Sequence, residues 1–154
     1  RKAVDIARSN GTAVALSLSD SFCVERHRAS FMNFVGDGVD IVVADEDEVN
    51  ALFETENFDD TLAAIDGTSN LWAMTRSAEG SVVVQGDEKI VQPATAVEEI
   101  VDTTGAGDAW CAGFLYGWTH GLPLSDCARY GTACATQVIQ QLGARIEPGA
   151  LDDI

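Results

Sequence analysis

The sequence "EEIVDTTGAGDAWCAGFLYGW", residues 98–118, places two glycines between a short β-prone run and a helical pattern. A short β-prone run leads into Asp102, and Gly105 and Gly107 then precede a stretch with helical periodicity. Glycine permits a positive φ and has no Cβ that would keep a ligand away from the main chain. The N–H groups of residues 105–108 would open a helix without acceptors inside it. Together with the positive end of the helix dipole, they predict an anion site that needs no lysine.

The composition limits the classes of protein and of partner. A chain of 154 residues with 46% hydrophobic and 22% charged residues is typical of one globular domain. The 9 Lys and Arg residues stand against 25 Asp and Glu residues, which gives a net charge of −16. This balance argues against nucleic acid or an anionic membrane as a partner. No run of about 18 apolar residues predicts a membrane span.

The four cysteines do not form a metal-binding pattern. They lack a C-x-x-C motif and paired histidines, so a zinc site is not predicted. We expect small buried hydrophobic side chains at most of them and a cytoplasmic location, where thiols stay reduced. They are Cys23, Cys111, Cys127 and Cys134.

The pattern along the chain alternates between strands and helices, which predicts an α/β fold with a mainly parallel sheet. In such sheets ligands bind beyond the carboxyl ends of the strands, and Asp45 and Asp102 both follow predicted strands. Helices are predicted at 2–9, 20–35, 46–54, 58–67, 105–119 and 124–142. Strands are predicted at 12–19, 38–45, 70–75, 80–86 and 89–95, the last two joined by a Gly-Asp turn at 86–87.

The chain begins inside a predicted helix, without an initiating Met and without a preceding strand. A parallel sheet that starts on a helix suggests earlier strands. We therefore interpret residues 1–154 as part of a longer protein.

Two familiar nucleotide-binding motifs do not match. The glycine loop has no G-x-x-x-x-G-K-[ST] pattern, because it contains no lysine. A dinucleotide fingerprint would need glycine three positions after Gly107, where Trp110 stands. A dinucleotide-dependent oxidoreductase and a non-catalytic nucleotide-binding or interaction domain remain the alternative functions, which NAD(H) or ATP binding would distinguish.

The segment "VDTTGAGDAWCAGF" resembles the C-terminal signature of the ribokinase/PfkB family of carbohydrate and nucleoside kinases. "VVADEDEVNALF", "AMTRSAEGSVVV" and "YGTACATQVIQQLGAR" follow the family's order and spacing. The resemblance implies a ribokinase-like three-layer α/β/α sandwich with a mainly parallel sheet. Family members are roughly twice this length, so residues 1–154 would be the C-terminal, nucleotide-binding part of the kinase domain. The N-terminal half and its β-sheet lid lie outside the sequence.

The resemblance implies an ATP-dependent kinase that phosphorylates an alcohol. It assigns Asp108 as the catalytic base that accepts the hydroxyl proton. It also assigns the amides of Gly105, Ala106 and Gly107 to an anion hole for the γ-phosphate. A base beside an anion hole is what phosphoryl transfer to an alcohol requires. The structural alternative for Asp108 is a capping or dipole role in the first helical turn.

The resemblance also implies cation sites. Glu48 matches a family glutamate that helps to organise Mg²⁺ and phosphate through water, and Asp45 stands where the family usually has asparagine. A solvated acidic helix start is the alternative for this cluster. Asp102 and the carbonyl of Thr104 match positions that hold a monovalent cation such as K⁺ in many members. The alternative for Asp102 is an aspartate that caps its own turn.

Further residues match nucleotide-contacting positions. Thr75 and Gly80 fit a Thr-x-Gly-x-x-Gly loop, in which Ser77 replaces the middle glycine; a strand-to-strand turn is the alternative. Thr132 matches a position near the adenine, and a helix-packing threonine is the alternative. Gly143 matches a loop position near the cation, with a helix C-cap glycine as the alternative.

The phosphate acceptor would be a primary hydroxyl of a sugar or nucleoside. The segment "LSDSFCVERHR", residues 18–28, resembles the bacterial adenosine-kinase-like branch and favours adenosine. The basic residues 26–28 in this segment could touch a phosphate, but we expect them to form the polar face of the helix at 20–35. Family members often assemble through the lid, so a homodimer of the whole protein is a further expectation.

Overall fold

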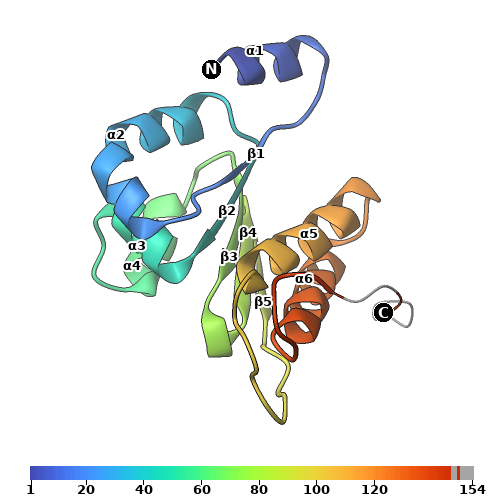
Figure 1. Ribbon diagram of the computed structural model, residues 1–154. Helices are drawn as coiled ribbons and strands as arrows, with labels where there is room; N and C mark the ends of the chain where they lie inside the picture. Colours follow the sequence, from blue (N-terminus) through green and yellow to red (C-terminus); the bar gives the residue numbers. More distant parts are fainter. Residues whose placement is uncertain (147–148, 150–154) are drawn as a thin grey trace. The chain divides into compact units, whose positions relative to one another are not determined.

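The computed structural model describes residues 1–146 and 149. The chain divides into two compact units. The first comprises Arg1–Met74 and Val84–Lys89, and the second comprises Thr75–Val83 and Ile90–Ile154. Figure 1 labels the elements of both units along the chain.

The described residues form a five-stranded sheet with the order β1-β2-β3-β4-β5. Strands β1 and β2 pair in parallel, with Ala15 opposite Ile41, as the alternation of strand and helix predicts. A turn at residues 86–87 joins β4 to β5, which confirms the predicted hairpin. The strands are β1 (Ala15–Ser17), β2 (Ile41–Asp45), β3 (Leu71–Thr75), β4 (Ser81–Gln85) and β5 (Glu88–Gln92).

All six predicted helices are present in the described part of the chain (Figure 1). None of these helices is long and apolar enough to cross a membrane. They are α1 (Lys2–Ser9), α2 (Ser21–Asp37), α3 (Glu46–Phe53), α4 (Phe58–Ile65), α5 (Ala106–Thr119) and α6 (Leu124–Val138), with a short 3₁₀ helix, η1 (Ser77–Glu79), between β3 and β4. Asp20 caps α2 by accepting a hydrogen bond from the Cys23 N–H group at 2.9 Å.

The last helix, α6, is shorter than the sequence pattern predicts. It ends at Val138, whereas the predicted helix extends to residue 142. After Ile139 the N–H groups of Gln140 and Gln141 donate to carbonyls three residues earlier, each at 3.4 Å, so the α-helical pattern stops there. The Ile139 carbonyl accepts from the Val101 N–H group at 2.8 Å, a tertiary contact at the end of the helix.

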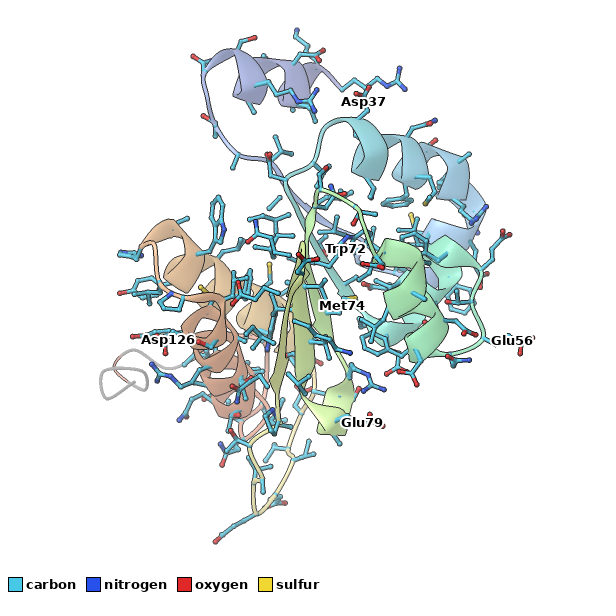
Figure 2. The ribbon with its side chains drawn as sticks, turned by 180° about the vertical axis from the view of Figure 1, so that it is seen from behind. Asp37, Glu56, Trp72, Met74, Glu79 and Asp126 are labelled. Carbon is cyan, nitrogen blue, oxygen red and sulfur yellow. The ribbon has the colours of Figure 1, made fainter. Side chains whose placement is uncertain are left out.

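The core of the first unit forms around β2 and β3. Residues 41–44 of β2 are all buried. On β3 the side chains of Trp72 and Met74 have no exposed surface (Figure 2). The indole N–H group of Trp72 donates to the Thr68 hydroxyl at 2.8 Å, so its polar atom is satisfied. A well-packed core therefore supports Asp45 at the carboxyl end of β2.

In the second unit, α5 and α6 approach closely through glycines. A Cβ at Gly113 would lie 2.5 Å from the Tyr130 carbonyl oxygen, and a Cβ at Gly131 would lie 2.8 Å from the Trp110 ring. The Trp110 and Phe114 rings stack with centroids 5.2 Å apart, and both side chains are buried. This packing holds the first turns of α5, which follow the glycine loop, against α6.

The cysteines behave largely as small hydrophobic residues. Cys127 and Cys134 are buried, Cys111 is half-buried and Cys23 is exposed; all four are free thiols. Burial, with a smaller effect of the nearby Asp108 charge, raises the pKa of the Cys111 thiol. These thiols are therefore protonated at neutral pH wherever they are buried.

Candidate active site

Gly105 is the N-cap residue of α5 and has a conformation that other residues rarely adopt. Its φ is +77°, and the helix start has no side-chain cap. A Cβ at this position would lie 2.5 Å from the Cβ of Ala144. Both the backbone conformation and the close approach of Ala144 therefore require glycine at residue 105.

The amide groups of the glycine loop are not equivalent. The Ala106 N–H group donates to the Thr103 carbonyl at 3.1 Å, so the turn itself uses one of the three amides assigned to the anion hole. For the amides of Gly105, Gly107 and Asp108, the described residues provide no acceptor. These three N–H groups at the positive end of α5 are the donors that an anion would meet.

Gly107 differs from Gly105, because the fold does not require its lack of a side chain. Its φ lies outside the left-handed region, and a Cβ built on it meets no atom within 4 Å. The space beside Gly107 is therefore open. A glycine with unoccupied space at a helix start leaves room for a ligand to reach the main chain.

Asp108 lies in the first turn of α5 and is exposed. Among the described residues, no main-chain N–H group donates to the Asp108 carboxylate, so the capping alternative is not realised in them. A favourable interaction with the helix dipole remains. The exposed carboxylate stands one residue after Gly107 and can accept a proton from a bound hydroxyl group.

Asp102 connects the glycine loop to the turn that follows α6. Its Oδ1 accepts from the Thr104 N–H group at 2.9 Å, and its Oδ2 accepts from the Gly143 N–H group at 3.0 Å. Hydrogen bonds from the Thr104 side chain, and from these two main-chain groups, lower the pKa of the Asp102 carboxyl group. Asp102 thus caps its own turn, as one alternative predicted, and also reaches a distant loop.

Gly143 lies outside α6 and is not its C-cap, which is Ile139. Its φ of +88° is left-handed, and a Cβ there would meet no atom within 4 Å. Glycine is needed here for the backbone conformation that points its N–H group at Asp102.

The predicted nucleotide loop has the backbone of a glycine-rich turn. Ser77 has a φ of +49°, in the left-handed region, at the position where the sequence pattern usually has glycine. Gly80 has a φ of +95°, and a Cβ there would lie 2.6 Å from the Ala94 nitrogen. The Arg76 N–H group donates to the Gly80 carbonyl at 2.7 Å and closes the turn that follows Thr75. Glu79, labelled in Figure 2, forms an ion pair with Arg76 at 2.8 Å.

Thr132 is a buried residue of α6, with 7% of its surface exposed. Its carbonyl accepts a hydrogen bond from the Thr136 hydroxyl at 2.7 Å. The burial of Thr132 in α6 therefore fits the alternative of a helix-packing threonine.

The first unit contains the two carboxylates predicted to organise a divalent cation. Asp45 ends β2 and caps α3, where its Oδ1 accepts from the Glu48 N–H group at 2.8 Å. Glu48 Oε2 accepts from the Asp45 N–H group at 2.9 Å. Burial, opposed by this hydrogen bond and aided by the charge of Asp45, raises the pKa of Glu48.

These carboxylates could hold a divalent ion only together with other ligands. Among the described residues, no three His, Cys, Asp or Glu side chains are arranged to hold a metal. Each carboxylate uses one oxygen in the pair of hydrogen bonds and has a second oxygen. This donor set fits Mg²⁺, which keeps several waters and takes one or two carboxylates besides substrate phosphates.

The basic residues 26–28 do not form an anion site in the structure. Arg26 and His27 are exposed on α2, while Arg28 donates to the Leu52 carbonyl at 2.7 Å and pairs with Glu54 at 3.0 Å. Arg26 and His27 thus fit the alternative of a polar helix face, whereas Arg28 connects α2 to the end of α3.

Sequence reasoning missed Ile139 and Ala144. Ile139 accepts hydrogen bonds from the segment before the glycine loop, and Ala144 packs against Gly105. Neither residue carries reactive chemistry or a turn signal, and only their distant partners reveal their role.

The model of the pfkB family of carbohydrate kinases matches residues 1–149 of the chain. The chain belongs to the pfkB family. A cytidine kinase of Thermococcus kodakarensis, which is similar to this pfkB chain, is 31% identical over 88% of it. The match covers 50% of the cytidine kinase, and the chain spans about half the length of the curated relatives it matches.

Solved structures agree with this assignment. An adenosine kinase from Sinorhizobium meliloti superposes with a TM-score of 0.92 and is 45% identical over 97% of this pfkB chain and 46% of that one. A probable sugar kinase from Rhizobium etli also superposes with a TM-score of 0.92, at 40% identity over 97% and 46% of the two chains. The ribokinase-like α/β fold predicted from the sequence is confirmed.

Proposed function

We propose that the protein containing this chain is an ATP-dependent phosphotransferase that moves the γ-phosphoryl group to a primary hydroxyl of a sugar or nucleoside. In the reaction, the hydroxyl oxygen forms a bond to the γ-phosphorus and its proton passes to a carboxylate oxygen of Asp108. The bond between the γ-phosphorus and the bridging β–γ oxygen breaks, and ADP leaves. Charge on the transferred group requires hydrogen-bond donors that are in place beforehand.

The observation that supports this proposal best is the open space at Gly107. The fold does not need glycine there, yet the residue stands between unpaired amides and the exposed carboxylate of Asp108. A phosphoryl group bound to the N–H groups of Gly105 and Gly107 would explain why this position has no side chain. The Ala106 amide contributes less, because it already donates to Thr103.

The proposal includes Mg²⁺ as the divalent cation that neutralises phosphate charge. Glu48 and Asp45 would hold it, largely through water, as the family resemblance implies. A Vibrio cholerae fructokinase structure similar to this chain, 26% identical and with a TM-score of 0.81, is described with bound fructose, ADP and a calcium ion. K⁺ at Asp102 and the Thr104 carbonyl is the further cation in the proposal.

Thr75, Ser77 and Gly80 would contact the nucleotide, with Thr132 and Gly143 on the α6 side. The left-handed φ of Ser77 supports this assignment, since the residue reproduces the backbone that a glycine would adopt. The main chain of such a turn can come close to a phosphate or ribose.

A nucleoside, with adenosine first, is the acceptor that we propose. The 45% identity to the Sinorhizobium meliloti adenosine kinase over nearly the whole chain supports this choice. The chain is also similar to sugar kinases, so the acceptor panel includes hexoses. The residues that select the acceptor are expected in the half of the protein beyond this sequence.

The test is an assay of the full-length protein with ATP and Mg²⁺ against a panel of nucleosides and hexoses. We expect ADP release that depends on one acceptor, and a phosphate monoester of that acceptor by ³¹P NMR. ATP binding without phosphorylation of any acceptor would favour a non-catalytic nucleotide-binding domain. Saturable NAD(H) binding without ATP binding would favour the oxidoreductase alternative.

A further inference from the structure

The arginines of the second unit differ in whether their charge is paired. The sequence of this unit contains three Lys or Arg residues. Arg76 forms an ion pair with Glu79 at 2.8 Å, and Arg129 forms one with Asp126 at 3.4 Å. Arg145 is exposed, and the described residues provide no ion pair for its side chain. The guanidinium group of Arg145 is therefore available to a ligand.

The fold holds the main chain of Arg145 against the glycine loop. A Cβ built on Gly105 would lie 3.0 Å from the Cα of Ala144, the residue before Arg145. Because consecutive Cα atoms are about 3.8 Å apart, the Arg145 Cα lies at most about 7 Å from that position. The Gln141 side chain donates a hydrogen bond to the Arg145 carbonyl and fixes the backbone there. The side chain of Arg145 thus starts from a defined place beside the loop.

An arginine at this place can contact an anion bound to the loop. A phosphate held by the Gly105 and Gly107 amides would lie about 3 Å from their nitrogens. Ala144 is exposed, so its neighbour Arg145 can approach such a phosphate from the solvent side. The flexible stem of Arg145 spans this distance, and its planar fork can donate two parallel N–H groups to phosphate oxygens.

The charges around the loop make such a cation useful. Asp102 precedes the loop, and Asp108 follows it, so both neighbouring side chains that carry charge are acidic. The amides at the start of α5 supply only partial positive charge, equivalent to roughly half an elementary charge. A nucleotide brings several negative charges on its phosphates, which the Asp108 carboxylate repels. A guanidinium group beside the loop would offset this repulsion.

We propose that Arg145 is a further nucleotide-binding residue, whose guanidinium group donates hydrogen bonds to the β-phosphate of the nucleotide held at the Gly105 and Gly107 amides. This inference rests on the proposed function, because it concerns the same anion site. It adds a full positive charge from a side chain to the main-chain donors of that site. ATP and ADP both carry a β-phosphate, so Arg145 strengthens the binding of both nucleotides.

Two variants of Arg145 and one control, all in the full-length protein, isolate this contact. Arg145→Gln removes the charge and keeps a polar side chain. Arg145→Lys keeps the charge but loses the planar fork. Arg129→Gln is the control, because Arg129 is an exposed arginine of α6 that pairs with Asp126 and lies 5.0 Å from the centroid of the Tyr130 ring.

The first measurement is calorimetric titration with ADP in the presence of Mg²⁺. Arg145→Gln should bind ADP roughly 10- to 100-fold more weakly, because charge-assisted hydrogen bonds to the phosphate are lost. Arg145→Lys should recover part of this affinity, and Arg129→Gln should bind ADP as the wild type does. Wild-type affinity for ADP in Arg145→Gln would overturn the proposal.

Steady-state kinetics give a second signature of the same contact. In Arg145→Gln the KM for ATP should rise by a similar factor, while kcat stays within about twofold, because the β-phosphate is bound in the ground state and in the transition state alike. A lower kcat with an unchanged KM for ATP would contradict this role.

Two further measurements need no turnover. Thermal unfolding without nucleotide should give Arg145→Gln the Tm of the wild type, because the side chain is exposed. A fall in ADP affinity together with a lowered Tm would show that Arg145 supports the fold instead. In the wild type, ADP should slow the modification of Arg145 by phenylglyoxal, followed by peptide mass spectrometry, and leave that of Arg129 unchanged. Equal modification of Arg145 with and without ADP would also overturn the proposal.

Failure of the proposed function gives a different result. A wild-type protein that binds ADP but phosphorylates nothing in the acceptor panel would reject the kinase assignment, and the ADP affinities would still decide the role of Arg145. A wild-type protein that phosphorylates an acceptor, with full ADP affinity in Arg145→Gln, would reject the role of Arg145 alone. Absence of ADP binding to the wild type would overturn both.

Discussion

Asp45 and Glu48 bond to each other's main chain across the first turn of α3. Asp45 Oδ1 accepts from the Glu48 N–H group, and Glu48 Oε2 accepts from the Asp45 N–H group. The pair satisfies two helix-start donors reciprocally. Glu48 is 7% exposed, so this acidic helix start is not simply solvated.

The capping hydrogen bonds of Asp45 and Glu48 are compatible with binding of a divalent cation by the same two side chains. The capping box fixes the direction of both side chains before any ion binds, which lowers the entropy lost on binding. It also places a carboxylate in a buried position, where the charged form is disfavoured.

Replacing Glu48 with Gln should change how stability depends on pH. Burial raises the Glu48 pKa above its ordinary 4.5, so the folded state binds this proton more tightly than the unfolded state. Its contribution to stability is complete below that ordinary value and is lost as pH rises through the folded pKa. Glu48→Gln keeps the capping acceptor and removes the titration.

The measurement is urea unfolding of the full-length wild type and Glu48→Gln between acidic and neutral pH. We expect the variant to gain stability relative to the wild type as the pH rises. An identical pH profile for both proteins would contradict the assignment. Glu56→Gln, at an exposed carboxylate that is not among the charges acting on Glu48, is the control.

Asp108→Asn should abolish most turnover while leaving the fold intact. Loss of the proton acceptor should lower kcat roughly 10²- to 10⁴-fold, since a positioned base contributes about that much. ADP affinity, measured by calorimetry on the full-length protein, should change little, because the side chain is exposed and the described residues show it making no cap. Turnover near the wild-type rate would show that another group takes the proton.

The two glycines of the loop should respond in opposite ways to alanine. Gly105→Ala should destabilise the protein by about 1–3 kcal/mol, because its φ is left-handed and Ala144 occupies the space. Gly107→Ala should leave stability unchanged or raise it by up to about 1 kcal/mol, since alanine is the better helix former.

Among the folded molecules, we expect kcat to fall more in Gly107→Ala than in Gly105→Ala, the reverse of the order in stability. The methyl group of Gly107→Ala would occupy the open space beside the amides, and kcat should fall at least about tenfold. Denaturant midpoints and kcat of both variants provide the check. A fully active Gly107→Ala protein would mean that the open space is not where the phosphoryl group binds.

Ser77 can be tested through its backbone conformation. Ser77→Gly should be neutral or stabilise by up to about 1 kcal/mol, because relief of the left-handed φ offsets the greater freedom of the unfolded glycine. Ser77→Val should destabilise by roughly 1–3 kcal/mol, because a β-branched residue strongly disfavours this φ. Thermal unfolding of the full-length variants measures both. Equal stability of the two variants would mean that Ser77 does not hold the left-handed conformation in solution.

Local sequence signals predicted most of the elements. The helix at α5 followed from apolar periodicity after two glycines, and the Gly-Asp pair at 86–87 located the hairpin turn. The Asp20 cap of α2 is also local, because capping needs only residues within one turn. Such features depend on neighbours in the chain and can be inferred without the fold.

Features that depend on distant contacts could not be inferred in the same way. The apolar pattern of the last helix continues to residue 142, but the helix ends at Val138, and the Ile139 carbonyl accepts hydrogen bonds from the distant Val101 and Asp102. The sequence pattern does not distinguish the two glycines of the loop. In the structure a Cβ at Gly105 would clash with Ala144, whereas a Cβ at Gly107 would meet no atom within 4 Å.

By itself, the sequence determined that a lysine-free glycine turn opens a helix beside Asp108, because glycine spacing and helix periodicity are properties of a single segment. The tertiary structure decided which glycine of the loop is crowded by a neighbour and which distant group Asp102 accepts from. Those outcomes depend on residues 139–144, which lie more than thirty positions further along the chain and meet the loop only after folding.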